Sequence, residues 1–282
     1  MVQLRRSCSL LGVVDADTLR VEWEGHPRLV RLMDVDPERA TPGGTKPTTD
    51  FGRRTLRWAK EVVFAQVTDV VLGFPGEEPQ LSNSGKLLGY VFVGGENYNV
   101  RLIREGWSPC FTKYGNPRIF REEMEQAELQ ARLDGRGIWG GRGGRGDYHA
   151  LKTYWLLRAG QVDACRHATA TGEDILGCRL DYRDIVARAQ SGTSGCVFSD
   201  LARAFHMADG SVMIQLGSPQ NPLSAFFPPG ARDLAGFLQR EFLGFGKPNY
   251  LFFHGRLSMV GEQPQITIEM LEQVSTCPLR NN

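Results

Sequence analysis

The sequence lacks any apolar run close to the ~20 residues that a membrane-spanning helix requires, so we expect no membrane association. Its 33 basic and 32 acidic residues leave a net charge of only +1. Any binding of a polyanion therefore depends on local patches. The six cysteines form no compact framework, and we expect free thiols in a reducing compartment. These absences predict a cytoplasmic protein on the sequence as given, and a secreted or periplasmic one if a signal peptide was removed.

The 282 residues are enough for two modest domains, because one core rarely grows much beyond ~250 residues. A hydrophobic content of 41% can fill two cores. A flexible, polar stretch rich in glycine and arginine at 141–147 predicts a linker. We therefore expect a first domain over 1–140, and a helical connector with a second domain over 148–282.

The second domain is predicted to be rich in β-structure. We expect strands at 196–205, 211–216, 250–257 and 265–270, with a helix at 231–242 inserted among them. Short strands with one inserted helix favour a small barrel of the oligonucleotide/oligosaccharide-binding (OB) kind. A fragment of a β-sandwich is the alternative.

The most informative stretch runs from residue 13 to residue 38. Apolar and polar side chains alternate over 18–24, which is typical of a half-buried strand. Asp17 shares the parity of the apolar set, so we expect its side chain to point inward. A turn at 24–27 returns the chain as a second strand that carries Arg31. Together with the acids at 34, 36 and 38, these side chains are of the types that bind a metal ion and a phosphate.

Five separated motifs occur in a fixed order along the first half. They are Val14-Asp-Ala-Asp-Thr18, Val30-Arg-Leu32 with Asp36-Pro-Glu38, Gly85-Lys-Leu-Leu-Gly-Tyr-Val91, Leu102-Ile-Arg-Glu-Gly-Trp107, and Ala127-Glu-x-x-Ala-Arg132 with Gly137-Ile-Trp139. In this order they resemble the staphylococcal nuclease-like (thermonuclease) family over residues 10–139. The resemblance implies a five-stranded OB-type barrel with three helices. The expected fold class is thus mainly β with α (α+β).

The resemblance also implies calcium-dependent hydrolysis of the phosphodiester bonds of DNA and RNA. By position, Asp17 and Asp36 are the expected metal carboxylates, and carboxylate oxygens are hard ligands that Ca²⁺ takes. Arg31 would clamp the phosphate, and Glu38 would position or deprotonate the attacking water. The second cationic position of the family falls on Lys86.

Three further residues complete the expected site. Asp15 lies close by in the sequence, and we expect it to tune the field or to order a bound water. Lys113 and Tyr114 stand where the family stacks tyrosines against substrate, so we expect them to bind substrate. The expected partner is nucleic acid, with single-stranded DNA or RNA preferred.

Two features depart from the family pattern. The segment from Asp36 to Glu38 is one residue shorter, and a displacement of about 1 Å can cost ~100-fold in rate. Lys86 replaces an arginine, and a lysine cannot form a bidentate fork on a phosphate. Both departures predict reduced activity.

The sequence is therefore compatible with two functions. The enzyme is favoured because Asp17, Arg31, Asp36 and Glu38 are all present. The alternative is a catalytically degenerate module that binds nucleic acid or a protein partner without cleavage.

A third hypothesis concerns the aromatic residues of the second half. Phe226, Phe227, Phe252 and Phe253 could form a surface that contacts another protein. Under this hypothesis the C-terminal domain is an interaction scaffold.

Overall fold

The computed structural model describes residues 4–43, 46–82, 84–144, 146–178, 181–218, 221–244, 247 and 249–278. Contacts within the chain divide it into two compact units. The first comprises Met1–Thr112 and Asn116–Lys152, and the second comprises Lys113–Gly115 and Thr153–Asn282.

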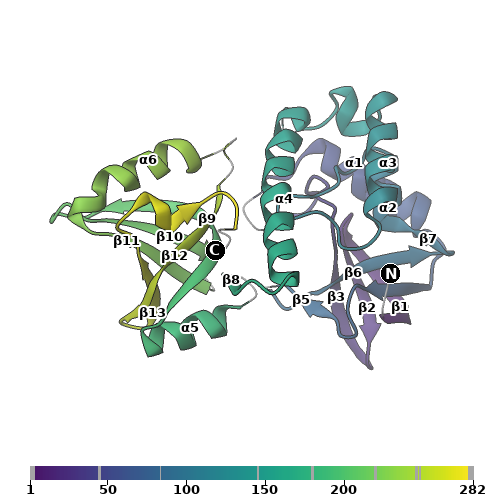
Figure 1. Ribbon diagram of the computed structural model, residues 1–282. Helices are drawn as coiled ribbons and strands as arrows, with labels where there is room; N and C mark the ends of the chain where they lie inside the picture. Colours follow the sequence, from purple (N-terminus) through teal and green to yellow (C-terminus); the bar gives the residue numbers. More distant parts are fainter. Residues whose placement is uncertain are drawn as a thin grey trace. The chain divides into compact units, whose positions relative to one another are not determined.

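The first unit is built on a closed five-stranded barrel (Figure 1). Its strands are β1 (Leu4–Asp15), β2 (Thr18–Trp23), β3 (His26–Leu32), β4 (Asp69–Phe74) and β6 (Leu87–Val93). Strand β1 pairs antiparallel with β2 and β4, and the parallel pairing of β3 with β6 completes the circle. Short strands β5 (Gln80–Leu81) and β7 (Glu96–Asn97) add to β6. The predicted OB-type barrel is confirmed.

The β2–β3 hairpin follows the alternation seen in the sequence. Leu19, Val21 and Trp23 are buried, the polar residues between them are exposed, and Asp17 is only 1% exposed. The inward direction predicted for Asp17 is therefore confirmed. Glu24 and Gly25 both have positive φ angles, as a two-residue hairpin turn requires.

Helices cover the first barrel. They are α1 (Asp50–Trp58) with the π-helical η1 (Ala59–Val63), α2 (Tyr98–Arg104), α3 (Arg121–Leu133) and the 3₁₀ turn η2 (Gly137–Gly140). Thr49 caps α1, because its side chain accepts a 2.9 Å hydrogen bond from the Gly52 N–H. Met124, Ala127 and Ala131 form the buried face of α3.

The second unit contains another closed five-stranded barrel. Its strands are β9 (Ser194–His206), β10 (Val212–Ser218), β11 (Asn221–Phe227), β12 (Tyr250–Val260) and β13 (Gln263–Thr267). Strand β9 pairs with β10 and β12, while β11 pairs with β10 and β13. Short strands β8 (Ile175–Gly177) and β14 (Val274–Ser275) lie beside β9 and β12. The predicted second OB-like barrel is confirmed, and strand β11 was missed from the sequence.

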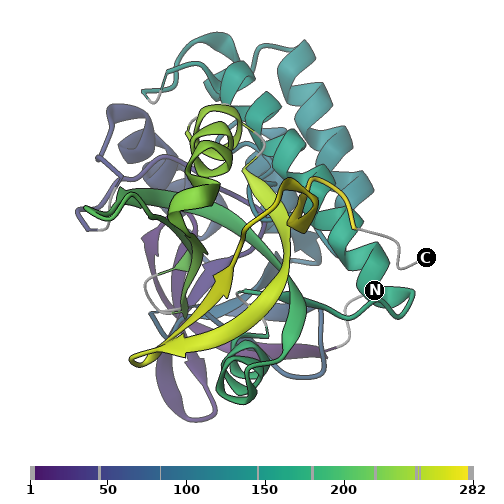
Figure 2. The ribbon, with the colours of Figure 1, turned by 60° about the vertical axis from the view of Figure 1, so that its left-hand side comes forward.

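Three longer helices and two 3₁₀ turns accompany the second barrel in the described part of the chain. They are α4 (Tyr148–Ala170), α5 (Tyr182–Ser191), η3 (Pro229–Ala231) with α6 (Arg232–Phe242), and η4 (Leu271–Gln273). Figure 2, like Figure 1, shows α5 and α6 at opposite ends of this barrel.

The aromatic residues of the second half belong mainly to its core. Phe227, Phe252 and Phe253 are fully buried, whereas Phe226 is half-buried. The hypothesis that all four form an exposed protein-binding surface is therefore wrong. Alternation along β11 points Phe227 into the barrel, and β12 is buried on both faces over residues 250–253.

The boundary between the units falls inside α4. Lys152 is buried and its ammonium lies 3.1 Å from Glu128 Oε2 and 2.5 Å from the Cys110 carbonyl oxygen. These contacts tie the first turn of α4 to the first unit. The stretch expected as a linker, of which Arg145 lies outside the described residues, is also grouped with the first unit.

The sequence predicted that the chain has no membrane association and that its cysteines are free thiols. Among the described residues, no helix has the length and apolar content needed to cross a bilayer. All six cysteines are free thiols. Burial raises the pKa of the Cys110 thiol to about 12, so this cysteine is a packed apolar group rather than a reactive one.

Candidate active site

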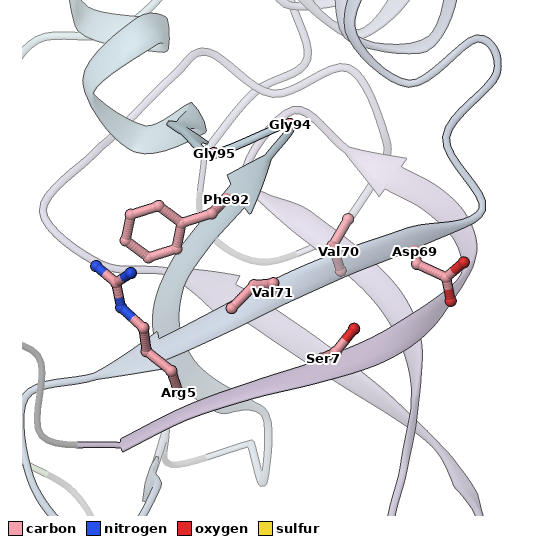
Figure 3. Close-up of a pocket in the computed structure, with 8 residues that line it drawn as sticks. All are labelled: Arg5, Ser7, Asp69, Val70, Val71, Phe92, Gly94 and Gly95. Atoms are coloured by element: carbon pink, nitrogen blue, oxygen red, sulfur yellow. The ribbon is translucent and has the colours of Figure 1, made fainter.

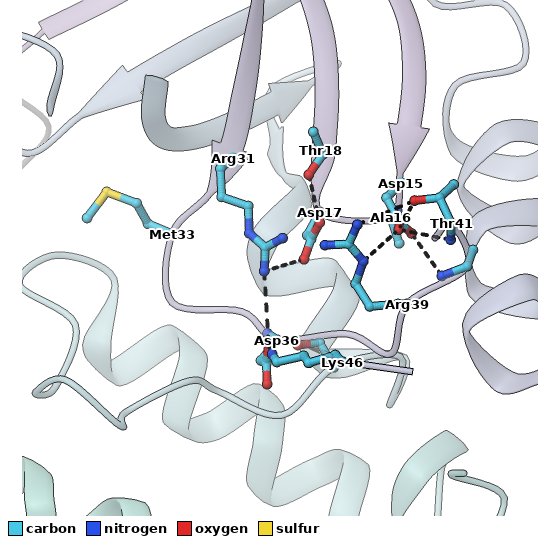
Figure 4. A network of polar contacts seen from close by, with 12 residues as sticks. Asp15, Ala16, Asp17, Thr18, Arg31, Met33, Asp36, Arg39, Thr41 and Lys46 are labelled. Atoms are coloured by element: carbon cyan, nitrogen blue, oxygen red, sulfur yellow. Dashed lines mark hydrogen bonds and ion pairs between the residues drawn. The ribbon is translucent and has the colours of Figure 1, made fainter. Parts of the chain in front are cut away.

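The mouth of the first barrel lies where β2 begins and β3 ends. Thr18 and Arg31 are opposite each other in the β2–β3 ladder, and Asp17 immediately precedes Thr18. Arg31 Nη2 lies 2.7 Å from Asp17 Oδ2 and 3.9 Å from Asp36 Oδ1 (Figure 4). Both aspartates are buried. One guanidinium group thus brings the two expected metal carboxylates together.

Asp17 is a buried acid in a crowded electrostatic environment. Burial raises the pKa of Asp17, and the charge of Arg31 and a 2.9 Å hydrogen bond from the Thr18 hydroxyl oppose this rise. The negative charges of Asp15 and Asp36 raise the pKa further. Asp17 Oδ2 is buried and accepts no hydrogen bond from the described residues, because Arg31 approaches it outside hydrogen-bonding geometry. Such an oxygen beside two other acids favours a cation.

Asp36 is held from two other directions. Its backbone N–H donates a 2.8 Å hydrogen bond to Ser108 Oγ. Its Oδ1 forms an ion pair with the ammonium of Lys46, which comes from the segment between β3 and α1. Lys46 was not predicted as a site residue, because a lysine in a turn-rich loop carries no motif.

The chemistry of Asp17 and Asp36 fits a calcium ion. Both supply hard oxygen ligands, and the buried Oδ2 of Asp17, which forms an ion pair with Arg31, accepts no hydrogen bond from a described residue. Among the described residues, no group of three or more His, Cys, Asp or Glu side chains is arranged to hold a metal. Asp17 and Asp36 are therefore the carboxylates that would hold a calcium ion here.

Asp15 holds the loop at residues 39–41. Its carboxylate accepts hydrogen bonds from the Ala16 N–H at 2.9 Å and from the Thr41 hydroxyl at 2.8 Å. Arg39 Nε lies 3.3 Å from Asp15 Oδ2. Arg39 is therefore a second guanidinium group at the barrel mouth. Sequence reasoning missed it, although its place directly after the acidic segment was an available signal.

Glu38 is buried, and its carboxylate accepts hydrogen bonds from Thr49, Gly144 and Tyr148. The Gly144 N–H and the Tyr148 hydroxyl donate to its Oε1, each at 2.7 Å. The Thr49 hydroxyl donates to its Oε2. These donors fix the carboxylate against the start of α1 and the segment at 144–148. The role of Glu38 as a catalytic base stays a prediction.

The glycine-rich stretch after α3 makes this arrangement sterically feasible. A Cβ atom on Gly144 would lie 3.1 Å from Glu38 Oε2, and one on Gly143 would lie 2.7 Å from the Tyr148 ring. Both are closer than ordinary packing allows, so glycine is needed for the close approach. The sequence suggested only flexibility here, whereas the structure gives these residues contacts with Glu38.

Lys86 is placed by the register of the barrel. Arg31 is opposite Leu88 in the parallel β3–β6 pair. Lys86 is therefore level with Leu29, about 7 Å along the strands from Arg31. In the described part of the chain Lys86 has no ion-pair partner, and no contact links it to the aspartates. Its role as the second cation stays a prediction.

Lys113 and Tyr114 are grouped with the second unit. The Lys113 carbonyl accepts a 3.0 Å hydrogen bond from Arg158 Nε, and the Lys113 ammonium lies 5.3 Å from the centre of the Tyr114 ring. Tyr114 is 43% exposed, whereas Arg158 is buried. Substrate binding by Lys113 and Tyr114 stays a prediction.

A pocket of about 290 Å³ lies elsewhere on the first barrel (Figure 3). It is lined by residues of β1, β4 and β6 and by the Gly94-Gly95 turn. The Arg5 guanidinium lies 4.7 Å from the centre of the Phe92 ring. None of the expected site residues lines this pocket, so it is not the candidate active site.

The fold and the polar mouth define the first unit as an OB-fold barrel that carries an acidic and basic cluster at one end. Residues 29–141 match the family described as "Staphylococcal nuclease homologue". The chain therefore contains a staphylococcal nuclease-like segment, as the sequence motifs predicted.

Curated relatives agree with this assignment. The thermonuclease of Staphylococcus hyicus is 27% identical over 132 residues, which cover 46% of this chain and 73% of the relative. The thermonuclease of Staphylococcus intermedius is 28% identical over 128 residues, covering 45% and 72%. The SPbeta prophage-derived endonuclease YokF of Bacillus subtilis is 25% identical over 133 residues, covering 46% and 43%. These relatives support a nuclease at the level of the family.

Proposed function

We propose that the first unit is a calcium-dependent phosphodiesterase that cleaves nucleic acid, with single strands as the preferred substrate. The observation that carries this proposal is that carboxylate oxygens of Asp17 and Asp36 both lie within 4 Å of Arg31 Nη2. Hard oxygen ligands beside a guanidinium group suit a metal ion and a phosphate diester. When bound, the calcium ion would supply positive charge beside the phosphate oxygens.

In the proposed reaction, Arg31 binds the scissile phosphate and stabilises the charge that develops on its oxygens. The oxygen of a water molecule forms a bond to phosphorus while the bond to the 5′ oxygen breaks. The water proton passes to the Glu38 carboxylate, and the departing oxygen takes a proton from solvent. The products are a 3′-phosphate end and a 5′-hydroxyl end.

The surroundings of Glu38 favour a reduced rate. Its carboxylate is engaged by Thr49, Gly144 and Tyr148, so it must reorient or exchange a hydrogen bond to accept the proton of the attacking water. The segment from Asp36 to Glu38, one residue shorter than in the family pattern, supports the same conclusion. Together with lysine at position 86, it supports a slower enzyme.

The hydrogen bonds to Glu38 also favour a second candidate function. If Glu38 stays bound to these donors, the first unit would be a degenerate module that binds nucleic acid without cutting it. The arginine and lysine side chains at the mouth would still bind phosphate.

Incubation of the full chain with a single-stranded oligonucleotide and Ca²⁺ separates the two functions. We expect cleavage that a chelator abolishes and that Glu38→Gln reduces at least ~100-fold. Binding without cleavage, with protein in excess over the oligonucleotide, would establish the degenerate module instead.

A further inference from the structure

We propose that Arg39 is the second guanidinium group that binds the scissile phosphate, the role that the family pattern gives to the position of Lys86. This inference rests on the proposed function of the first unit. In Figure 4, Arg31 and Arg39 lie on either side of the Asp17 carboxylate. The Arg39 side chain is 20% exposed, so it is anchored in the protein while part of it reaches solvent.

Asp15 does not need Arg39 to satisfy its hydrogen-bonding capacity. Besides the bonds from Ala16 and the Thr41 hydroxyl, the backbone N–H groups of Ala40 and Thr41 approach the Asp15 carboxylate at 3.4 Å each. The Arg39 contact is thus an ion pair added to a carboxylate that already has several donors.

The guanidinium group of Arg39 makes few hydrogen bonds to the described residues. Its Nε is buried, lies 3.3 Å from Asp15, and makes no hydrogen bond to any described residue. Its Nη2 makes one long hydrogen bond, 3.5 Å, to Thr41 Oγ1. A guanidinium group has five N–H donors in a fixed fork that matches two phosphate oxygens. Arg39 is therefore positioned by charge and keeps donors for a ligand.

Arg39 is better placed than Lys86 for this role. It forms an ion pair with Asp15, which lies close enough to Asp17 to raise the pKa of that residue. Lys86 is two positions along the strand from the row of Arg31. A lysine also lacks the planar fork that an arginine offers to a phosphate.

The charges of the cluster support the same conclusion. The carboxylates of Asp15, Asp17 and Asp36 are balanced by three cations, which are Arg31, Arg39 and Lys46. With the proposed base Glu38 included, a divalent ion would give the site a net charge of +1, which rises to +2 as Glu38 accepts the water proton. A phosphodiester carries one negative charge and approaches two as water attacks. The positive charge of the site thus rises together with the negative charge on the phosphate.

The test compares Arg39→Ala, Arg39→Lys and Lys86→Ala in the full chain. We expect Arg39→Ala to lower kcat about 100- to 1000-fold and Arg39→Lys to recover part of the loss. Lys86→Ala should lower kcat less than ~10-fold. Calcium affinity, measured by calorimetry, should be nearly unchanged in Arg39→Ala. Arg20→Ala, on the exposed face of β2, is the matched control and should cleave like the wild type.

Two outcomes would overturn the proposal. One is wild-type kcat in Arg39→Ala with a large loss in Lys86→Ala. The other is a loss in Arg39→Ala that thermal unfolding shows to be loss of the fold, with no recovery in Arg39→Lys.

A wild type that does not cleave would refute the proposed enzyme but would still leave Arg39 testable. Binding of a single-stranded oligonucleotide is then measured against salt concentration. The slope of log K against log salt should shrink by about 0.7 in Arg39→Ala, the value for one lost phosphate contact. An unchanged slope would rule out phosphate binding by Arg39.

Discussion

The two barrels of this chain share one strand order but differ at their mouths. Going round the first barrel the order is β1-β2-β3-β6-β4, and round the second it is β9-β10-β11-β13-β12. In each barrel the third and fifth of these strands in chain order pair in parallel, and the other neighbouring strands pair antiparallel. A helix lies between the third and fourth strands in both, α1 in the first and α6 in the second.

The difference lies in the residues at equivalent positions. In the first barrel the pair that opens β2 and closes β3 is Thr18 with Arg31, and in the second barrel it is Val212 with Phe227. Val212 and Phe227 are fully buried and close the end of the core. The pair at this position is therefore polar and charged in the first barrel and apolar in the second. Function here depends on a few side chains and not on the fold alone.

Removing the arginine of the first mouth should have the largest effect. We expect Arg31→Gln to lower kcat by at least ~1000-fold, because the charge that meets the phosphate in the transition state is lost. The measurement is oligonucleotide cleavage under single-turnover conditions. Ser211→Ala, at the position in the second barrel that corresponds to Asp17, should leave kcat unchanged. A similar loss in both variants would contradict the contrast between the mouths.

The apolar mouth of the second barrel should matter for stability instead. Phe227→Ala removes a fully buried ring, and we expect the second unit to lose about 3–5 kcal/mol in free energy of unfolding. Urea unfolding followed by hydrogen exchange can assign the loss to the second unit. The first unit should keep its protection, and a loss shared by both units would show that their cores unfold together.

The first barrel also receives a hydrogen bond from α4, in which the Tyr148 hydroxyl donates to Glu38. We expect Tyr148→Phe to raise kcat by about 10-fold, because it removes one of the donors that engage the proposed base while the ring remains. Calcium affinity should change little, since the Tyr148 hydroxyl donates its hydrogen bond to Glu38. The pH profile of kcat separates an orienting role from a purely structural one, which would leave the profile in place.

The sequence predicted local structure better than long-range contacts. The β2–β3 hairpin and the inward Asp17 followed from the alternation of apolar and polar residues. The contact of Glu38 with Tyr148 spans 110 positions, so no local pattern could reveal it. Strand β11 was missed because its Asn-Pro start is typical of a turn, and pairing with β10 and β13 overrides that preference.

The smallest expected change in stability concerns the burial of the charge on Asp17. Because burial raises the pKa of Asp17, the folded state binds its proton more tightly than the unfolded state does. The stabilisation from the protonated form is fully present below the unfolded pKa of ~4 and is lost as pH rises through the folded value.

Asp17→Asn should therefore be more stable than the wild type at pH 7, because the substitution removes the cost of burying the carboxylate charge. The difference should shrink as the pH falls towards 4. Thermal unfolding of both proteins between pH 4 and pH 8 measures it. Since the substitution also removes an expected metal carboxylate, it should abolish cleavage while it stabilises the fold. A less stable Asp17→Asn variant at pH 7 would mean that the ion pair with Arg31 outweighs the cost of burial.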